Sequence, residues 1–212
     1  MRHGLTPRCS QTLRRECIRW RLLAIALLIL LLPACSATIV PPLQPADPVT
    51  VVLLDHGRHS SLVLPDAAGG ALRYSYGDWD YYVLRQTDLA SGARALLRGT
   101  PAALGRQQLA VAPESDSLLR ALHVEVIQAW RLEVERARVT RLRDDLEHQF
   151  HSALDTRVYS PWFGVDFVQH PALYTLNHNS NHVVGVWLTE LGCEIRGQPT
   201  LSSWTVLSPR DD

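Results

Sequence analysis

The spacing of apolar residues changes along the chain, and these changes predict where helices and strands lie. Over residues 135–154 the apolar positions recur every three or four residues, as they do on the buried face of an α-helix. Residues 180–191 carry a second stripe of the same period, which ends before Gly192, a residue typical of helix ends. A shorter amphipathic segment predicts one more helix over residues 88–98.

Short β-favouring runs predict strands on either side of these helices. The runs 50–54, 59–64 and 71–76 are separated by polar turns, which is the pattern of antiparallel hairpins. Weaker patterns predict strands at 107–111, 124–134 and 204–207, and a helical turn at 114–122. Together these elements predict an α+β fold in which a central antiparallel sheet is flanked by helices.

The first 35 residues have the pattern of a bacterial signal peptide. An uninterrupted apolar run of 11 residues, 22–32, follows four nearby arginines and stops at Pro33. This run is shorter than the roughly 20 apolar residues that a membrane-spanning helix needs. No later stretch comes near that length, so we expect no polytopic membrane protein.

The end of this leader resembles the lipobox of bacterial lipoproteins. Small Ala34 precedes Cys35, and Ser36 follows it. The resemblance implies that Cys35 carries a lipid, whereas an ordinary secretory signal cleaved nearby or a signal anchor remains as an alternative. In lipoproteins an aspartate after the lipidated cysteine retains the protein at the inner membrane. Ser36 therefore favours an outer-membrane anchor with the domain facing the periplasm.

Residues 36–49 contain four prolines and predict an extended, semi-rigid spacer between the lipid and a single α+β domain at 50–212. Removal of the leader takes six of the 21 basic residues and one of the 21 acidic residues, which leaves a net charge near −5. Such a domain lacks the basic surface that nucleic acid requires. Cys193 is then the single unlipidated cysteine, and we expect a buried, inert thiol.

Two polar segments are candidates for chemistry. In the first, Asn177-His178-Asn179-Ser180-Asn181-His182, Ser180 could be a nucleophile supported by the helix N-terminus. The simpler interpretation is that Asn179, Ser180 or Asn181 caps the helix. The second segment, 55–61, contains His56 and His59, either as general bases or as hydrogen-bonded structural residues.

The same histidines offer a different chemistry. His56 and His59, with His178 and His182, could supply a zinc site. The chain lacks both an H-E-x-x-H motif and a C-x-x-C motif. We therefore prefer a site without metal or cofactor.

Three segments, 56–60, 76–82 and 179–181, resemble the DUF2459 family of bacterial proteins. That family's pattern is H-G-x-H-[ST], then G-W-G-D with aromatic residues after it, then N-C-N at a helix start. The order of histidine and cysteine is also similar to permuted papain-like proteins, the relatives of NlpC/P60 and lecithin-retinol acyltransferase. The resemblance implies that fold, together with hydrolysis or acyl transfer at amides or esters.

In this chain Ser180 stands where the family has cysteine, and Cys193 lies beyond the other end of the predicted helix. The resemblance implies either that Ser180 is a nucleophile or that the domain has lost catalysis and kept a pocket. In the catalytic case His59 is the base and Asp78 orients it. Further pocket residues would be His56, Asn179, Asn181 and His182.

Three functions follow as expectations for a lipoprotein of the cell envelope. The first is a Ser/His hydrolase or acyltransferase that acts on envelope amides or esters, such as peptidoglycan peptides or lipids. The second is a non-catalytic lipoprotein that binds such a ligand or a partner. The third is a protein with a histidine-ligated metal. The sequence does not identify the substrate.

Overall fold

The computed structural model describes residues 20, 36–85, 99–200 and 202–207. The described residues do not include Cys35, the predicted helix at 88–98, or the predicted signal peptide apart from Trp20. One compact unit begins at Ser36, directly after the predicted lipidation site. Among the described residues no helix is long and apolar enough to cross a membrane.

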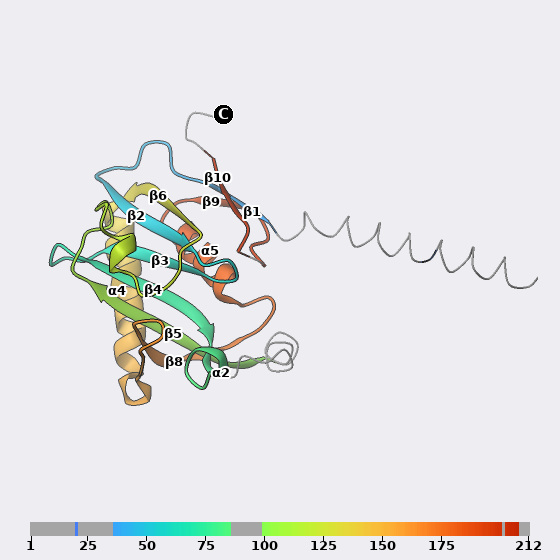
Figure 1. Cartoon of the computed structure of the whole chain (residues 1–212). Coiled ribbons are helices and arrows are strands. Elements are labelled where there is room, and N and C mark those ends of the chain that lie inside the picture. The colour runs from blue at the N-terminus through green and yellow to red at the C-terminus, as the bar shows by residue number, and fades with distance from the viewer. Residues whose placement is uncertain (1–19, 21–35, 86–98, 201, 208–212) are drawn as a thin grey trace, which may run out of the picture. The chain divides into compact units, whose positions relative to one another are not determined.

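The main sheet has seven strands, and every neighbouring pair is antiparallel (Figure 1). Its strands, in chain order, are β2 (Pro48–Asp55), β3 (Ser60–Pro65), β4 (Ala71–Asp78), β5 (Thr100–Leu109), β6 (Gln128–Glu135), β7 (Val158–Ser160) and β8 (Val165–Tyr174). Their spatial order is β6-β2-β3-β4-β5-β8-β7. The prediction of an α+β fold with a central antiparallel sheet is confirmed.

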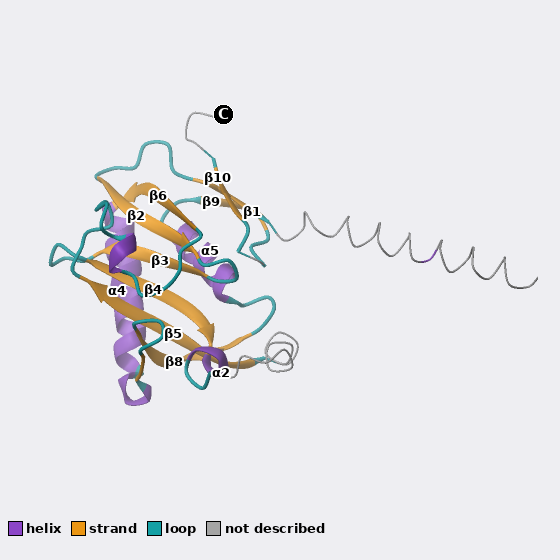
Figure 2. Ribbon diagram, in the orientation of Figure 1, coloured by secondary structure: helices purple, strands orange, loops and turns teal. Residues whose placement is uncertain are grey.

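Two helices, α4 (Arg136–Ser152) and α5 (Ser180–Glu190), cover one face of this sheet, behind it in Figure 2. The apolar residues of α4 at three- and four-residue spacing are all buried, namely Val139, Leu142, Leu146 and Phe150. They form one core with the side chains of α5 and the sheet residues that point to the same face. Both long helices predicted within the described residues are thus confirmed, and the core explains their apolar stripes.

In the described residues, the opposite face of the sheet is covered by connecting segments that contain only short helical turns. The single-turn helix α2 (Trp79–Tyr82) follows β4, and the 3-10 turns η2 (Leu119–Ala121) and η3 (Leu154–Thr156) lie in later connections. Two separate apolar clusters form on this face. One centres on Val52, Val63 and Leu118, and the other on Tyr82 and Phe167. The helices therefore flank the sheet on one side.

The predicted spacer is wrong for its first residues. β1 (Ala37–Val40) forms a second, three-stranded sheet with β9 (Glu194–Gly197) and β10 (Trp204–Val206), in the order β10-β1-β9. Ala37 and Ile39 are buried in the main core. The prolines follow this strand, so the chain is part of the folded unit before it reaches them. The predicted spacer 36–49 also overlaps β2, which begins at Pro48.

The sequence pattern missed β7 and β8 and placed the start of β5 seven residues late. The pairing of β5 with β8 shifts register between Pro101 and Ala102, and two residues of β8, Pro171 and Ala172, fall into the shift. Proline cannot donate to a strand ladder and is tolerated at such bulges. Prolines within both strands thus concealed the period of two that predicts a strand.

Candidate functional site

The turn between β2 and β3 is held by the polar residues that stood out in the sequence. The Asp55 carboxylate accepts a 2.7 Å hydrogen bond from the backbone N–H of Gly57. The His56 N–H donates to the His59 carbonyl at 2.9 Å. Gly57 has a φ of +89°, a conformation that glycine adopts without strain. This tight turn presents the side chains of His56 and His59 on the same side of the sheet.

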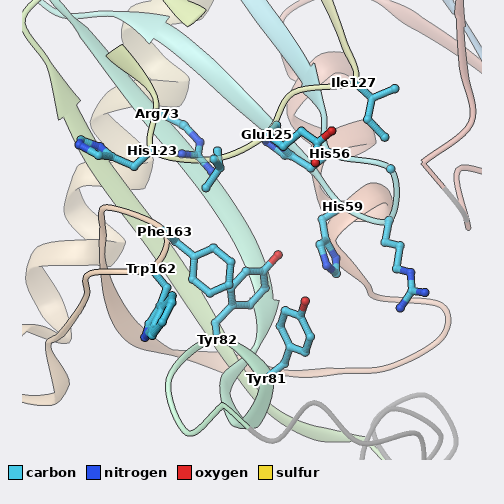
Figure 3. Close-up of a pocket in the computed structure, with 13 residues that line it drawn as sticks. His56, His59, Arg73, Tyr81, Tyr82, His123, Glu125, Ile127, Trp162 and Phe163 are labelled. Carbon is cyan, nitrogen blue, oxygen red and sulfur yellow. The ribbon is translucent and has the colours of Figure 1, made fainter. Parts of the chain in front are cut away.

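Both histidines line a cavity of about 680 Å³ on the face of the sheet away from α4 and α5 (Figure 3). Its walls come from four parts of the chain: the β2–β3 turn, β4 with α2, residues 123–127, and residues 162–163. The lining residues that Figure 3 labels are His56, His59, Arg73, Tyr81, Tyr82, His123, Glu125, Ile127, Trp162 and Phe163. The volume lies in the range of small-molecule sites.

A chain of hydrogen bonds fixes the polar side of the cavity. Arg73 Nε donates to Ser61 Oγ at 3.1 Å, and Ser61 Oγ lies 2.9 Å from His56 Nε2. His56 Nδ1 lies 2.7 Å from the Glu125 carbonyl oxygen, which can only accept, so Nδ1 carries the proton. In the neutral ring Nε2 then accepts from the Ser61 hydroxyl. Burial, followed by the charge of Arg73, lowers the His56 pKa to about 4.

His59 contacts aromatic rings. Its ring centroid lies 5.4 Å from that of Tyr81 and 5.5 Å from that of Tyr82. Neither of its ring nitrogens makes a hydrogen bond with any described residue. Burial, followed by the charges of His56 and Arg58, lowers the His59 pKa to about 4. The imidazole is therefore neutral at neutral pH.

The second polar segment lies at the start of α5 and is built into the core. The N-cap is Asn179, whose side-chain oxygen accepts hydrogen bonds from the backbone N–H groups of Asn181 and His182 at 3.0 and 3.1 Å. Asn181 in turn accepts a 2.9 Å hydrogen bond from Ser60 Oγ and donates to the Arg58 carbonyl at 3.3 Å. This segment therefore anchors α5 to the β2–β3 turn. Asn179, Asn181 and His182 are not among the residues that line the cavity.

Ser180 occupies the first helical position of α5, next to the cap. The residue is 1% exposed, and its hydroxyl has no hydrogen-bond partner among the described residues. Burial raises the pKa of Tyr174, and the adjacent Ser180 offsets part of that rise. Ser180 does not line the cavity, and no hydrogen bond joins it to His59. No base in the described part of the chain accepts a hydrogen bond from this buried hydroxyl.

Asp78 does not orient His59, so that prediction is wrong. One carboxylate oxygen accepts from the backbone N–H of Tyr81 at 3.0 Å and thereby caps α2. The other accepts from Thr100 Oγ1 at 2.6 Å. Both oxygens are thus committed to the backbone and to β5. The three residues expected to form a triad do not form one in this structure.

The histidines considered as zinc ligands have other partners. His178 Nδ1 lies 2.9 Å from the hydroxyl of Tyr76. His182 contacts Asn179 and Gln198 through its two ring nitrogens. Within the described residues no group of three or more histidine, cysteine, aspartate or glutamate side chains is arranged to hold a metal ion.

Several cavity residues were missed by sequence reasoning, chiefly Arg73, Tyr82, Trp162 and Phe163. Arg73 did have a signal, because it is a charged residue inside the otherwise apolar start of β4, Ala-Leu-Arg-Tyr. Cys193 has the predicted character: it is buried, and burial raises its pKa to about 11. Such a thiol is a poor nucleophile at neutral pH.

Comparisons of the chain with protein-family models, with curated proteins and with solved structures each gave no match. The resemblance to the DUF2459 family therefore stays a prediction. The functional proposals rest on the sequence patterns and on the geometry of the described residues.

Proposed function

We propose that this chain is a lipid-anchored protein of the cell envelope whose domain binds a small ligand in the cavity beside His56 and His59. The observation that carries the proposal is the contrast between the two polar segments. The histidines open onto a cavity, whereas the hydroxyl of Ser180 is sealed in the core. Binding needs only the open cavity, but nucleophilic attack needs an accessible hydroxyl.

The fold proposal is a permuted papain-like domain related to the DUF2459 family. It is supported by the histidine just before β3 and by the packing of α5 against β3 and β4. The buried contact between Ser60 and Asn181 joins the two motif segments. We place the lipid on Cys35 and the domain on the periplasmic side of the outer membrane, where peptidoglycan peptides or lipids would be the accessible ligands.

A second candidate function, a Ser/His hydrolase or acyltransferase, has one observation in its favour. A buried polar atom without a partner is rare in proteins and calls for an explanation, and Ser180 Oγ at a helix start is such an atom. Catalysis would require a hydrogen bond between Ser180 and His59, and these two residues make none in the structure. The cavity, by contrast, is already open in the structure, and this favours the binding function.

A matched pair of tyrosines tests the binding proposal. Tyr81 lines the cavity, whereas Tyr159 is exposed on β7 and does not. Thermal unfolding of the full chain in neutral detergent, measured against benzamide concentration, reports binding through the rise in melting temperature. Tyr81→Ala should weaken benzamide binding about fivefold through the lost ring contact, and Tyr159→Ala should leave it unchanged. Equal effects of the two changes would contradict a ligand site in this cavity.

A further inference from the structure

Arg73 is a buried cation on the cavity face of the sheet. The strand that carries it, β4, alternates strictly: Leu72, Tyr74 and Tyr76 point into the core beneath the helices. Arg73 therefore points to the opposite face, where Figure 3 shows its side chain beside the cavity. It is 5% exposed. A guanidinium at such a position is costly to desolvate unless an opposite charge accompanies it.

The protein supplies Arg73 with neutral acceptors only. Nε donates to the hydroxyl of Ser61 at 3.1 Å, and one terminal nitrogen donates to the side-chain oxygen of Gln107 at 2.9 Å. Within the described part of the chain Arg73 makes no ion pair. Its other terminal nitrogen has no acceptor there. Among the described residues the one fully buried side-chain N or O atom without a partner is Ser180 Oγ, so this nitrogen of Arg73 is not fully buried. Donors of Arg73 are thus left for the cavity.

The charges around the cavity do not cancel this cation. Burial lowers the Arg73 pKa only to about 10, so the guanidinium stays charged at neutral pH. The neighbouring rings of His56 and His59 are neutral there, as shown above. Glu125 also lines the cavity, but its side chain is exposed and forms no ion pair with Arg73. Arg58 adds a second positive charge at the exposed rim.

The remaining wall is aromatic. Tyr82 lies against Phe163 at 5.0 Å between ring centroids and against Tyr81 at the same separation. Trp162 stands at the mouth, 62% exposed, with Arg85 over its ring at 4.1 Å. Apolar and aromatic walls with a few placed polar groups are the usual composition of small-molecule sites. Here the wall offers a surface for an apolar or planar body next to the buried cation.

We propose that the ligand of this cavity is an anion, a small molecule that places a carboxylate or phosphate group on Arg73 and a planar or apolar body against Tyr81, Tyr82 and Phe163. The inference rests on the proposed binding function and names its ligand class. An anionic group would supply the missing counter-charge and accept the free N–H donors of Arg73. The ring of His59, whose nitrogens make no hydrogen bond with the described residues, would add a neutral hydrogen bond from another wall of the cavity.

Three probes of one shape test the proposal: benzoate, phenyl phosphate and neutral benzamide. Their dissociation constants for the full chain in neutral detergent come from thermal unfolding at constant ionic strength. We expect benzoate or phenyl phosphate to bind at least about tenfold more tightly than benzamide, and the tighter of the two identifies the anionic group. If benzamide binds the wild-type protein as tightly as both anions do, the proposal is overturned.

Variants assign the preference to Arg73. Arg73→Met should abolish the preference for the anion over benzamide, whereas Arg58→Met at the rim should change the preference less than about threefold. Equal effects of the two changes would mean that general surface charge, and not Arg73, attracts the anion. Loss of the anion preference alone leaves the binding function intact. Absence of binding by all three probes, or binding that Tyr81→Ala does not weaken, contradicts the binding function itself.

Discussion

Ser60 Oγ donates a 2.9 Å hydrogen bond to Asn181 Oδ1, and this buried contact joins the start of β3 to the first turn of α5 across 121 residues of sequence. Trp204 Nε1 donates to the same Ser60 oxygen at 2.7 Å, so the C-terminal strand β10 converges on it too. Three distant parts of the chain thus depend on one hydroxyl. The contact sets the position of the β2–β3 turn that carries both cavity histidines.

The first prediction concerns this contact. Asn181→Ala should lower the free energy of unfolding by about 2 kcal/mol, because it removes the partner of Ser60 and leaves the Arg58 carbonyl without its donor. Urea denaturation of the variant measures the change. Asn177→Ala, at an exposed position in the same segment, is the control and should change it by less than about 0.5 kcal/mol. Similar losses in both variants would show that the Ser60 contact contributes little.

The second prediction separates Ser180 from its neighbour. Ser180→Ala should leave the free energy of unfolding unchanged or raise it by up to about 1 kcal/mol, since it removes a buried hydroxyl without a partner. Asn179→Ala should lower it by about 1–2 kcal/mol, because Asn179 is the N-cap. A serine-directed fluorophosphonate should not label Ser180. Labelling that disappears in Ser180→Ala would instead support the hydrolase.

The third prediction is a loss of stability in mild acid. Burial lowers the pKa of His56 and His59 from 6.5 to about 4. Between these values the unfolded chain binds protons that the folded chain does not, so the free energy of unfolding falls as the pH falls through this window. His56→Gln should reduce the slope by up to about 1.4 kcal/mol per pH unit.

Denaturation of wild type and variant at several values between about pH 6.5 and pH 4.5 gives these slopes. His148→Gln, at an exposed position of α4, is the control variant. A slope that His56→Gln leaves as steep as in wild type would mean that the folded protein admits the proton at His56.

The fourth prediction concerns the anchor. Cys35→Ser should leave the chain unprocessed or release it from the membrane fraction, because serine offers no thiol for the lipid. Cys17→Ser, in the predicted leader, should leave both the fractionation and the mature mass as in wild type. Membrane fractionation and mass spectrometry of the two variants make the comparison. An unchanged mature mass in Cys35→Ser would refute the lipobox interpretation.

The local pattern of the chain is sufficient for the elements whose side chains obey a simple period. The buried stripe of α4 is visible as Val139, Leu142, Leu146 and Phe150, and the runs that became β2, β3 and β4 are visible as apolar segments between polar turns. A period of 3.6 or of two follows from how neighbouring residues project from the backbone, so it can be recognised without knowing the fold. The helix start at 179–181 can also be recognised locally, because asparagine and serine are typical N-cap residues.

The cavity could not be recognised in this way, because its walls meet only through the order of strands in the sheet. Arg73 comes from β4, Glu125 and Trp162 from connections more than 35 residues apart, and the histidines from the β2–β3 turn. Burial also decides the protonation of His56 and seals the hydroxyl of Ser180. Both depend on desolvation by residues distant in the chain, a property of the packed structure that residue spacing does not contain.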